Sequence, residues 1–281
     1  MISIRKIVKS IFLTCLLIVL LASTCLGNEA SSEEKPIIIC TTSILADFTK
    51  EIGKDYIQVK EIVPAGMCPA HYDIKPSDIY TVSKATIVFS HGFEPWLQNL
   101  IESSGNRTTQ IIRVKGPWNP PSLAVEKMEM INESLCNNIP EKAEYFNKNA
   151  TDLIKTIHTN SKQIIEEANN LQVSKIKVIC NKFQKDFINW LGFNVIATYP
   201  PPEMISIKQF LKLLLKGKTE NVVLIIDNLQ SGTEFGSKLA FDLGATQIIL
   251  SNFPGAIPGT DSYANLIMYN ATQLFNGIKV K

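Results

Sequence analysis

The sequence has few charged residues and none of the common hydrolase motifs. Only 19% of its 281 residues are Asp, Glu, Lys or Arg, and only three are histidine. No Gly-x-Ser-x-Gly elbow of serine hydrolases and no His-Glu-x-x-His zinc-protease motif is present. We therefore expect a protein that acts by binding, without catalysis.

Dense basic segments are also missing beyond Arg5–Lys9. The formal net charge is +2, from 28 basic and 26 acidic residues, which gives nucleic-acid binding little support. The hydrophobic content of 45% indicates a folded, globular chain, long enough for one large or two medium domains.

The N-terminus has the pattern of an export signal. Basic residues in Arg5–Lys9 precede an apolar core, Ile11–Ala22, which is too short for a comfortable membrane span. Cys25 then stands where a lipoprotein signal has its lipidated cysteine, so we expect an exported chain at the cell surface or in the periplasm, anchored at Cys25. Ordinary cleavage after Gly27 is the alternative. The predicted signal covers 1–27 and a polar linker covers 28–36.

The exported part keeps an even number of cysteines. An oxidising compartment would permit one or two disulfides, although the sequence does not assign their pairing. These cysteines are Cys40, Cys68, Cys136 and Cys180.

Short apolar runs alternate with helical patterns along the rest of the chain. This alternation predicts an α/β fold with parallel sheets. The predicted strands are 37–42, 59–63, 87–90, 110–114, 176–180, 194–198, 222–226 and 246–250.

One helix is predicted to be much longer than the others. In Glu141–Asn170 the apolar residues keep close to one stripe, and roughly 30 residues at 1.5 Å each would span about 45 Å. We therefore predict two (β/α)4-like lobes joined by one long spine helix. The N-terminal lobe would cover 37–138, the spine 139–173 and the C-terminal lobe 174–281. His158 is expected on the solvated face of the spine.

A loop rich in turn-forming residues, 64–78, follows the second predicted strand. Gly66, Pro69 and Pro76 restrict its backbone, so it would present the His71 ring from a nearly fixed position. A loop of this kind usually displays ligands.

Two more candidates follow predicted strands. His91 comes directly after strand 87–90, at the sheet edge where open α/β folds bind ligands, or it caps the strand as a turn residue. Glu203 lies in the loop before a helix that starts with the capping box Ser206-x-x-Gln209, where it is a ligand or a solvated carboxylate.

Four segments resemble those of the zinc/manganese solute-binding proteins of ABC transporters (cluster A-I). They are Thr-Thr-Ser-Ile-Leu-Ala-Asp at 41–47, the Pro-rich loop 64–78, Val-Phe-Ser-His-Gly-Phe-Glu-Pro-Trp-Leu at 88–97, and Asp-Ser-Tyr at the start of 261–270. The resemblance implies a monomeric, two-lobed receptor tethered outside the membrane. Such a receptor captures Zn²⁺ or Mn²⁺ between its lobes as the transported ligand, uses no organic cofactor, and delivers the ion to a permease with its ATPase.

The resemblance implies three metal ligands in this chain. His71 matches the histidine of the first Pro-rich loop, Asp261 matches the late aspartate, and Glu203 matches a glutamate that precedes a helix. Two usual histidines are missing, because 115–120 reads Lys-Gly-Pro-Trp-Asn-Pro and 179–182 reads Ile-Cys-Asn-Lys. Asp261 could instead cap the last helix.

The fourth ligand is left open by the sequence. A zinc site takes about four N, S or O ligands, and the fourth could be His91 or a thiolate from Cys68 or Cys180. A thiolate would favour Zn²⁺ or Cu⁺ over Mn²⁺. Alternatively, Cys68 and Cys180 pair with each other or pack as inert thiols.

Three other functions are compatible with these features. The missing histidines, together with Trp118, Tyr199 and Pro200–Pro202, favour the same fold with a metal chelate or another small ligand as cargo. A surface adhesin built on this fold is the second. The third is an exported metal-dependent hydrolase that uses His71, His91 and Glu203.

Overall fold

The computed structural model describes residues 35–279. The described residues from Pro36 onward form one compact unit. The predicted signal, Cys25 and nearly all of the predicted linker lie outside the described residues. Within the described part, no helix combines the length and apolar character needed to cross a membrane.

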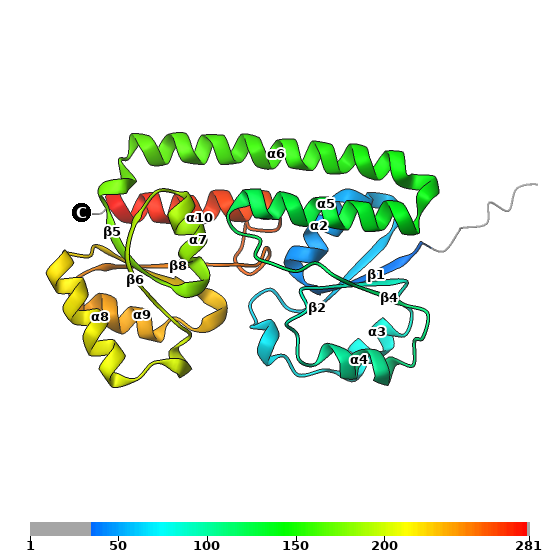
Figure 1. The fold of residues 1–281 in the computed structure, drawn as a ribbon, viewed down its shortest axis with the longest axis horizontal. Helices are drawn as coiled ribbons and strands as arrows, with labels where there is room; N and C mark the ends of the chain where they lie inside the picture. Colours follow the sequence, from blue (N-terminus) through cyan, green and yellow to red (C-terminus); the bar gives the residue numbers. More distant parts are fainter. Residues whose placement is uncertain (1–34, 280–281) are drawn as a thin grey trace, which may run out of the picture. The chain divides into compact units, whose positions relative to one another are not determined.

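The N-terminal lobe is built on a sheet of four parallel strands (Figure 1). Their order is β2 (Gln58–Val63), β1 (Ile37–Thr42), β3 (Ile87–Ser90) and β4 (Gln110–Arg113). The two central strands, β1 and β3, are almost wholly buried, as expected for a parallel sheet covered on both faces.

The C-terminal lobe repeats this arrangement. Its parallel strands are ordered β6 (Asn194–Tyr199), β5 (Lys177–Asn181), β7 (Leu224–Asn228) and β8 (Thr246–Leu250). In both sheets the first strand of the lobe is central, with the second on one side and the third and fourth on the other. The predicted α/β class with two parallel sheets is confirmed.

Helices cover both faces of the N-terminal sheet. The helices α2 (Ser43–Gly53) and α5 (Pro121–Asn138) pack on one face, and α3 (Pro76–Val82) and α4 (Leu97–Ser104) on the other. The alternation along β1 produces this, because Ile38 joins the first cluster of buried residues and its neighbour Ile39 joins the second.

The C-terminal sheet is covered in the same way. The helices α7 (Lys185–Trp190) and α10 (Tyr263–Lys279) pack on one face, and α8 (Ile207–Glu220) and α9 (Glu234–Leu243) on the other. Ile179 and Ile225 face α8 and α9 from the two central strands.

The long helix α6 (Ala143–Asn170) runs along both lobes (Figure 1). It packs on α2 and α5 of the N-terminal lobe and on α10 of the C-terminal lobe. Its 28 residues correspond to about 42 Å. His158 is exposed on its outer face, as predicted.

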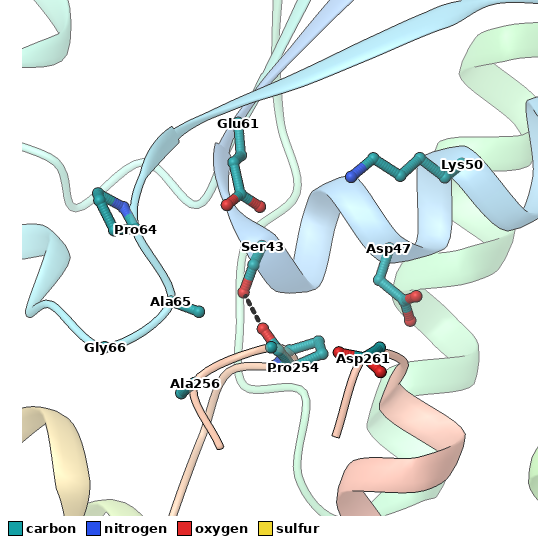
Figure 2. A pocket seen from close by; sticks show the side chains of 11 residues that line it. Ser43, Asp47, Lys50, Glu61, Pro64, Ala65, Gly66, Pro254, Ala256 and Asp261 are labelled. Atoms are coloured by element: carbon teal, nitrogen blue, oxygen red, sulfur yellow. Dashed lines mark hydrogen bonds between the residues drawn. The ribbon is translucent and has the colours of Figure 1, made fainter. Parts of the chain in front are cut away.

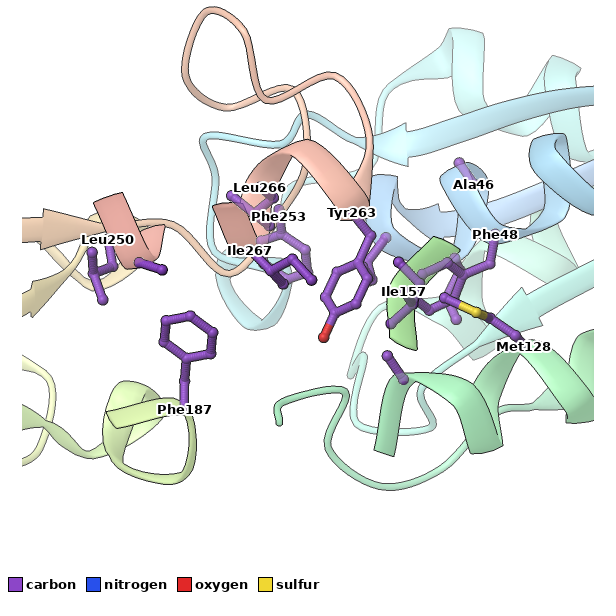
Figure 3. Packing of buried hydrophobic residues seen from close by; sticks show 14 of the residues in the cluster. Ala46, Phe48, Met128, Ile157, Phe187, Leu250, Phe253, Tyr263, Leu266 and Ile267 are labelled. Atoms are coloured by element: carbon purple, nitrogen blue, oxygen red, sulfur yellow. The ribbon is translucent and has the colours of Figure 1, made fainter. Parts of the chain in front are cut away.

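A single cluster of buried apolar residues continues from one lobe into the other (Figure 3). Tyr263, the first residue of α10, is fully buried and packs edge-on against Phe48 of α2, with ring centroids 5.4 Å apart. This shared core fixes the two lobes to each other on the side of α6.

Seven strands lie within one residue of their predicted bounds, and β7 is shifted by two. The helix α8 runs on to Glu220, and Gly217 lets it approach α9 closely, since a Cβ there would lie 2.6 Å from Leu243 Cδ1. The strand β7 starts two residues later than predicted, because Asn221 ends α8 in the left-handed conformation (φ 55°) and Val222 leads into the sheet. Asp227 therefore lies inside the strand.

Candidate functional site

The carboxyl ends of the two parallel sheets face each other. Strand-end loops of the N-terminal lobe hydrogen-bond directly to strand-end loops of the C-terminal lobe. These bonds run from Ser43 Oγ to the Pro254 carbonyl (2.8 Å), from Trp118 Nε1 to the Asn252 carbonyl (2.9 Å), and from Gln230 Nε2 to the Ala65 carbonyl (2.9 Å). Because ligands bind at this edge of open α/β sheets, the junction is the candidate site.

Neutral side-chain amides make up the C-terminal half of the junction. The Asn252 Oδ1 atom accepts hydrogen bonds from Gln184 Nε2 (3.1 Å) and Asn119 Nδ2 (3.3 Å). Gln184 Nε2 also donates to Asn228 Oδ1 (3.0 Å). Transition metals in proteins are usually bound by thiolate, imidazole or carboxylate groups, none of which takes part in this network.

Two of the buried amides have atoms without a partner. Gln184 and Asn181 are fully buried, and Gln184 Oε1 and Asn181 Nδ2 make no hydrogen bond to any described residue. The Asn181 Oδ1 atom accepts from the Phe183 backbone N–H at 3.0 Å, which fixes the side chain. Buried polar atoms are nearly always paired, so these two are free to bond a polar group that enters the junction.

His91 is buried on the N-terminal side of the junction. Its Nε2 lies 2.9 Å from Thr42 Oγ1, and its ring is held between Phe93 (centroids 5.1 Å apart, nearly parallel) and Trp118 (4.5 Å). Burial lowers the pKa of His91 to about 4, against the opposing effect of Glu94. The imidazole is therefore neutral at pH 7, with Nε2 occupied by Thr42.

Glu94 locks the turn that carries His91. Its Oε1 accepts from Thr41 Oγ1 (2.5 Å) and from the His91 backbone N–H (2.9 Å), and its Oε2 accepts from the Gly92 N–H (2.7 Å). Gly92 has a φ of 88°, which a residue with a side chain rarely adopts. Glu94 therefore serves the loop structure and is not a free carboxylate.

A polar cavity of about 430 Å³ lies beside the junction (Figure 2). Burial raises the pKa of Asp47 to about 7, and it also raises the pKa of Glu61. The Asp47 Oδ2 atom accepts a hydrogen bond from the Tyr263 backbone N–H at 2.8 Å. The lining residues are Ser43, Asp47, Lys50, Glu61, Pro64, Ala65, Gly66, Pro254, Gly255, Ala256 and Asp261.

A second hollow, of about 330 Å³, is lined by residues of both lobes, and we call it the aromatic groove. Phe93 and Trp118 line it from the N-terminal lobe, and Phe183 lines it from the C-terminal lobe. Phe93 and Phe183 are each about half exposed (50% and 49%). The remaining lining residues are Gly116, Pro117, Asn119, Lys182, Asp186 and Asn252.

The four predicted metal ligands all follow strand ends but do not form one group. His71 ends a short 3₁₀ turn, Pro69–His71, after β2, and Glu203 lies in another, Pro202–Met204, after β6. Both are exposed, as is Asp261, whereas His91 is buried. Among residues 35–279 no three His, Cys, Asp or Glu side chains are arranged to hold a metal ion. The predicted set is thus not assembled in this arrangement and stays a prediction.

The four described cysteines are free thiols, so Cys68 and Cys180 do not pair here. Cys180 is fully buried in β5, and burial raises its pKa to about 12. Cys40 occupies the corresponding place in β1 with the same shift from the same cause. Protonated thiols of this kind pack as small apolar groups, which disfavours Cys180 as a ligand.

Sequence reasoning did not find the amide network. A signal was nevertheless present, because an asparagine ends β5 (Asn181), ends β7 (Asn228) and follows β8 at Asn252. The edge rule that singled out His91 applies equally to these three.

Two parallel-sheet lobes that meet at their carboxyl edges under one long helix define a bilobed ligand-binding protein. Comparison with known protein families identifies the family of this chain. Residues 38–277 match the family described as zinc-uptake complex component A, periplasmic (ZnuA), and the chain belongs to this family.

The chain also matches curated relatives, at low sequence identity. The manganese ABC transporter substrate-binding lipoprotein PsaA of Streptococcus anginosus is 24% identical over 198 residues, which cover 61% of this chain and 63% of the relative. The iron ABC transporter substrate-binding lipoprotein MtsA of Streptococcus pyogenes serotype M1 is 31% identical over 105 residues, 35% of this chain and 33% of the relative. The matched stretches thus span less than two thirds of these relatives.

Solved structures share the fold. The Mn-bound periplasmic metal binding protein from Candidatus Liberibacter asiaticus superimposes with a TM-score of 0.73 at 17% identity. A crystal structure of ZnuA gives 0.74 at 18% identity. Each match covers 87% of this chain and 100% of the other.

Proposed function

We propose that this chain is the extracytoplasmic substrate-binding component of an ABC importer and acts by binding alone. The observation that carries the proposal is family membership over residues 38–277. The relatives named above are substrate-binding lipoproteins of ABC transporters, and the shared fold supports the same role. Its partners would be a permease and an ATPase, and Cys25 would anchor the exported chain to the membrane.

The proposed cargo is a divalent transition metal, with zinc and manganese as the first candidates. His71, Glu203 and Asp261 are the proposed ligands, and His91 is the candidate fourth. All four stand in loops at the carboxyl edges of the two sheets. Because they do not form one group here, metal capture would require the 64–75 and 200–206 loops to move, and His91 would have to give up Thr42.

A thermal-shift titration with Zn²⁺ and Mn²⁺ tests this ligand set. The wild-type chain should gain several degrees in Tm at saturating metal, because an ion that binds only the folded state stabilises it. His71→Ala and Asp261→Ala should lose most of that gain. The matched control is His158→Ala, which removes an exposed histidine from α6 and should keep it. Equal gains in all four proteins would refute the ligand set.

A second cargo is favoured by one specific observation, the aromatic groove beside the amide network. Three aromatic rings from both lobes surround a hollow whose volume suits a small organic molecule. The nearby amides, and the unpaired atoms Gln184 Oε1 and Asn181 Nδ2, suit hydrogen-bonding groups better than a bare ion. A planar metal chelate fits both features.

Tryptophan fluorescence separates the two cargoes. The Zn²⁺ complex of 1,10-phenanthroline serves as a planar probe, with Zn²⁺ alone as its control. If the groove takes a chelate, the complex should quench the wild type saturably, and Phe183→Ala should weaken its binding roughly 10-fold, as expected for loss of a stacking ring. Phe241→Ala removes an aromatic ring that is 86% exposed on α9 and should bind as wild type does. Saturable quenching by Zn²⁺ alone, unchanged in Phe183→Ala, would reject this cargo.

A further inference from the structure

The helix α8 carries large apolar side chains on the outside of the molecule. Ile207, Leu211 and Leu215 are 82%, 56% and 69% exposed. They recur every four residues and so form one row, about 12 Å long at 1.5 Å per residue. We call this the α8 row. Met204, just before the helix, is 61% exposed as well.

The row is separate from the face by which α8 packs on its own lobe. Phe210, Leu213 and Leu214 are partly buried against the sheet, and the Phe210 ring packs edge-on against Phe235 of α9 at 5.7 Å. Core packing therefore accounts for the inner face only. The outer row has no structural use in the described chain, and a run of this kind exposed to water marks an interaction surface.

Lysines accompany the row along the helix. Lys208, Lys212 and Lys216 each follow a residue of the row by one position, and Lys218 lies in line with the row beyond Leu215, at about 100° per residue. All four are exposed, and none of them forms an ion pair with a described residue. The only acidic residue of α8, Glu220, pairs with Lys177 on β5 at 2.9 Å.

We propose that the outer face of α8 docks on an anionic lipid surface. Lysine ammonium groups would bind lipid phosphates while the α8 row enters the boundary between headgroups and acyl chains, the arrangement of interfacial amphipathic helices. Charge complementarity selects this occupant, because the outer face of α8 carries four lysines that form no ion pair with a described residue, and the one carboxylate of the helix, Glu220, is bound to Lys177. The inference does not depend on which cargo the lobes take.

The N-terminal lobe provides a built-in contrast. Its exposed aliphatic side chains are Met67 (44%), Ile111 (40%) and Met130 (37%), and they lie apart, in the loop after β2, on β4 and on α5. No row comparable to that of α8 occurs among them. The docking surface is therefore confined to one lobe, and binding should orient the molecule.

Vesicle flotation tests the proposal with the exported chain, 28–281, which contains the whole compact unit. Vesicles would contain phosphatidylcholine with about 30% phosphatidylglycerol, and pure phosphatidylcholine vesicles would serve as the neutral reference. The wild type should bind the anionic vesicles at low salt and release them at about 0.5 M salt, where surface charges are screened. Binding that is equal on neutral and anionic vesicles would overturn the proposal.

Two triple variants locate the surface. Lys208→Glu/Lys212→Glu/Lys216→Glu should lower the partition coefficient on anionic vesicles at least 10-fold, and Ile207→Ser/Leu211→Ser/Leu215→Ser should lower it by a similar factor. Circular dichroism checks that both remain folded, which is expected because every changed side chain is exposed. Unchanged partitioning of either variant would overturn the proposal.

The matched control changes net charge equally at another helix. Lys148→Glu/Lys155→Glu/Lys162→Glu alters three exposed lysines of α6 and should reduce binding less than threefold. A loss as large as that of the α8 variant would show a general charge effect and contradict the proposal. Sedimentation without vesicles gives a second check. If the wild type is a dimer and the α8 serine variant is a monomer, the row binds a second copy of the chain, and the proposal is contradicted.

Discussion

The two lobes share one strand order but carry different chemistry at the same sheet edge. In the N-terminal lobe this edge holds a buried, neutral His91 and the carboxylate of Glu94. In the C-terminal lobe the strand ends carry amides, such as Asn181 and Asn228. The shared strand order fixes where the binding edge of each sheet lies. It does not fix what that edge binds, because the residues at the strand ends differ between the lobes.

Each lobe also buries one aspartate whose pKa is raised by burial. In the C-terminal lobe, Asp227 accepts from Tyr199 Oη (2.5 Å) and Gln247 Nε2 (2.8 Å), and its pKa rises to about 6. In the N-terminal lobe, Asp47 accepts one hydrogen bond within residues 35–279, from the Tyr263 N–H, and its pKa rises to about 7. Hydrogen bonds to a carboxylate lower its pKa and so oppose the rise caused by desolvation. The Asp47 carboxylate accepts fewer of them, so its pKa rises further.

The largest expected effect comes from glycines that differ between the lobes. A Cβ at Gly236 of α9 would collide with the Asp227 carboxylate, whereas a Cβ at Gly66 of the N-terminal loop would meet no atom within 4 Å. Gly236→Ala should therefore cost roughly 3 kcal/mol of unfolding free energy, and Gly66→Ala less than about 0.5 kcal/mol. Urea unfolding measures both. Similar stability of the two variants would show that the Asp227 carboxylate moves aside at little cost, and would contradict this prediction.

The buried aspartates should make stability fall as pH rises. The folded state keeps a proton on Asp47 that the unfolded chain releases near the ordinary pKa of 3.8, so this group's contribution is lost between about pH 4 and pH 7. Asp47→Asn has no such proton, and its stability relative to wild type should rise across that range and level off above it. Asp227→Asn should show the same rise, ending near pH 6.

Unfolding free energies measured from pH 4.5 to 8 check this difference between the lobes. The relative gain should be on the order of 1–2 kcal/mol, with the larger value for Asp47. A difference between variant and wild type that stays constant with pH would contradict the assigned cause.

A smaller effect separates bonds between the lobes from bonds within one. Trp118→Phe removes the bond to the Asn252 carbonyl across the junction, and Trp96→Phe removes the bond from Nε1 to the Pro69 carbonyl (2.7 Å) inside the N-terminal lobe. Each should cost about 1 kcal/mol. Hydrogen exchange should quicken in the 251–256 loop only for Trp118→Phe. Equal exchange there in both variants would mean that Trp118 does not couple the lobes.

Local patterns in the sequence predicted the elements well, for a physical reason. Apolar runs bounded by turn residues indicate a parallel strand that is buried on both faces. The apolar stripe in Glu141–Asn170 indicates a long helix that is buried on one side. His91 was placed at a strand end by the same logic. What these patterns could not show was that both sheets share one strand order, because order depends on how the connections cross over and not on any single segment.

Contacts between segments far apart in the sequence could not be predicted either. Asp261 was a candidate cap for the last helix, but α10 begins at Tyr263, whose N–H is taken by Asp47 from the other lobe. The two partners are 216 positions apart, so no local signal could reveal the bond. The amide network was missed for the same reason, since Gln184, Asn228 and Asn252 meet only in the folded chain.

The most direct test of the proposed function is the metal content of the chain purified without chelators or added metal. Elemental analysis should find one divalent transition metal ion per chain, retained through gel filtration and lost at low pH, where carboxylate and imidazole ligands are protonated. A chain that carries no metal, and takes up neither Zn²⁺ nor Mn²⁺ when dialysed against them, would contradict the metal assignment.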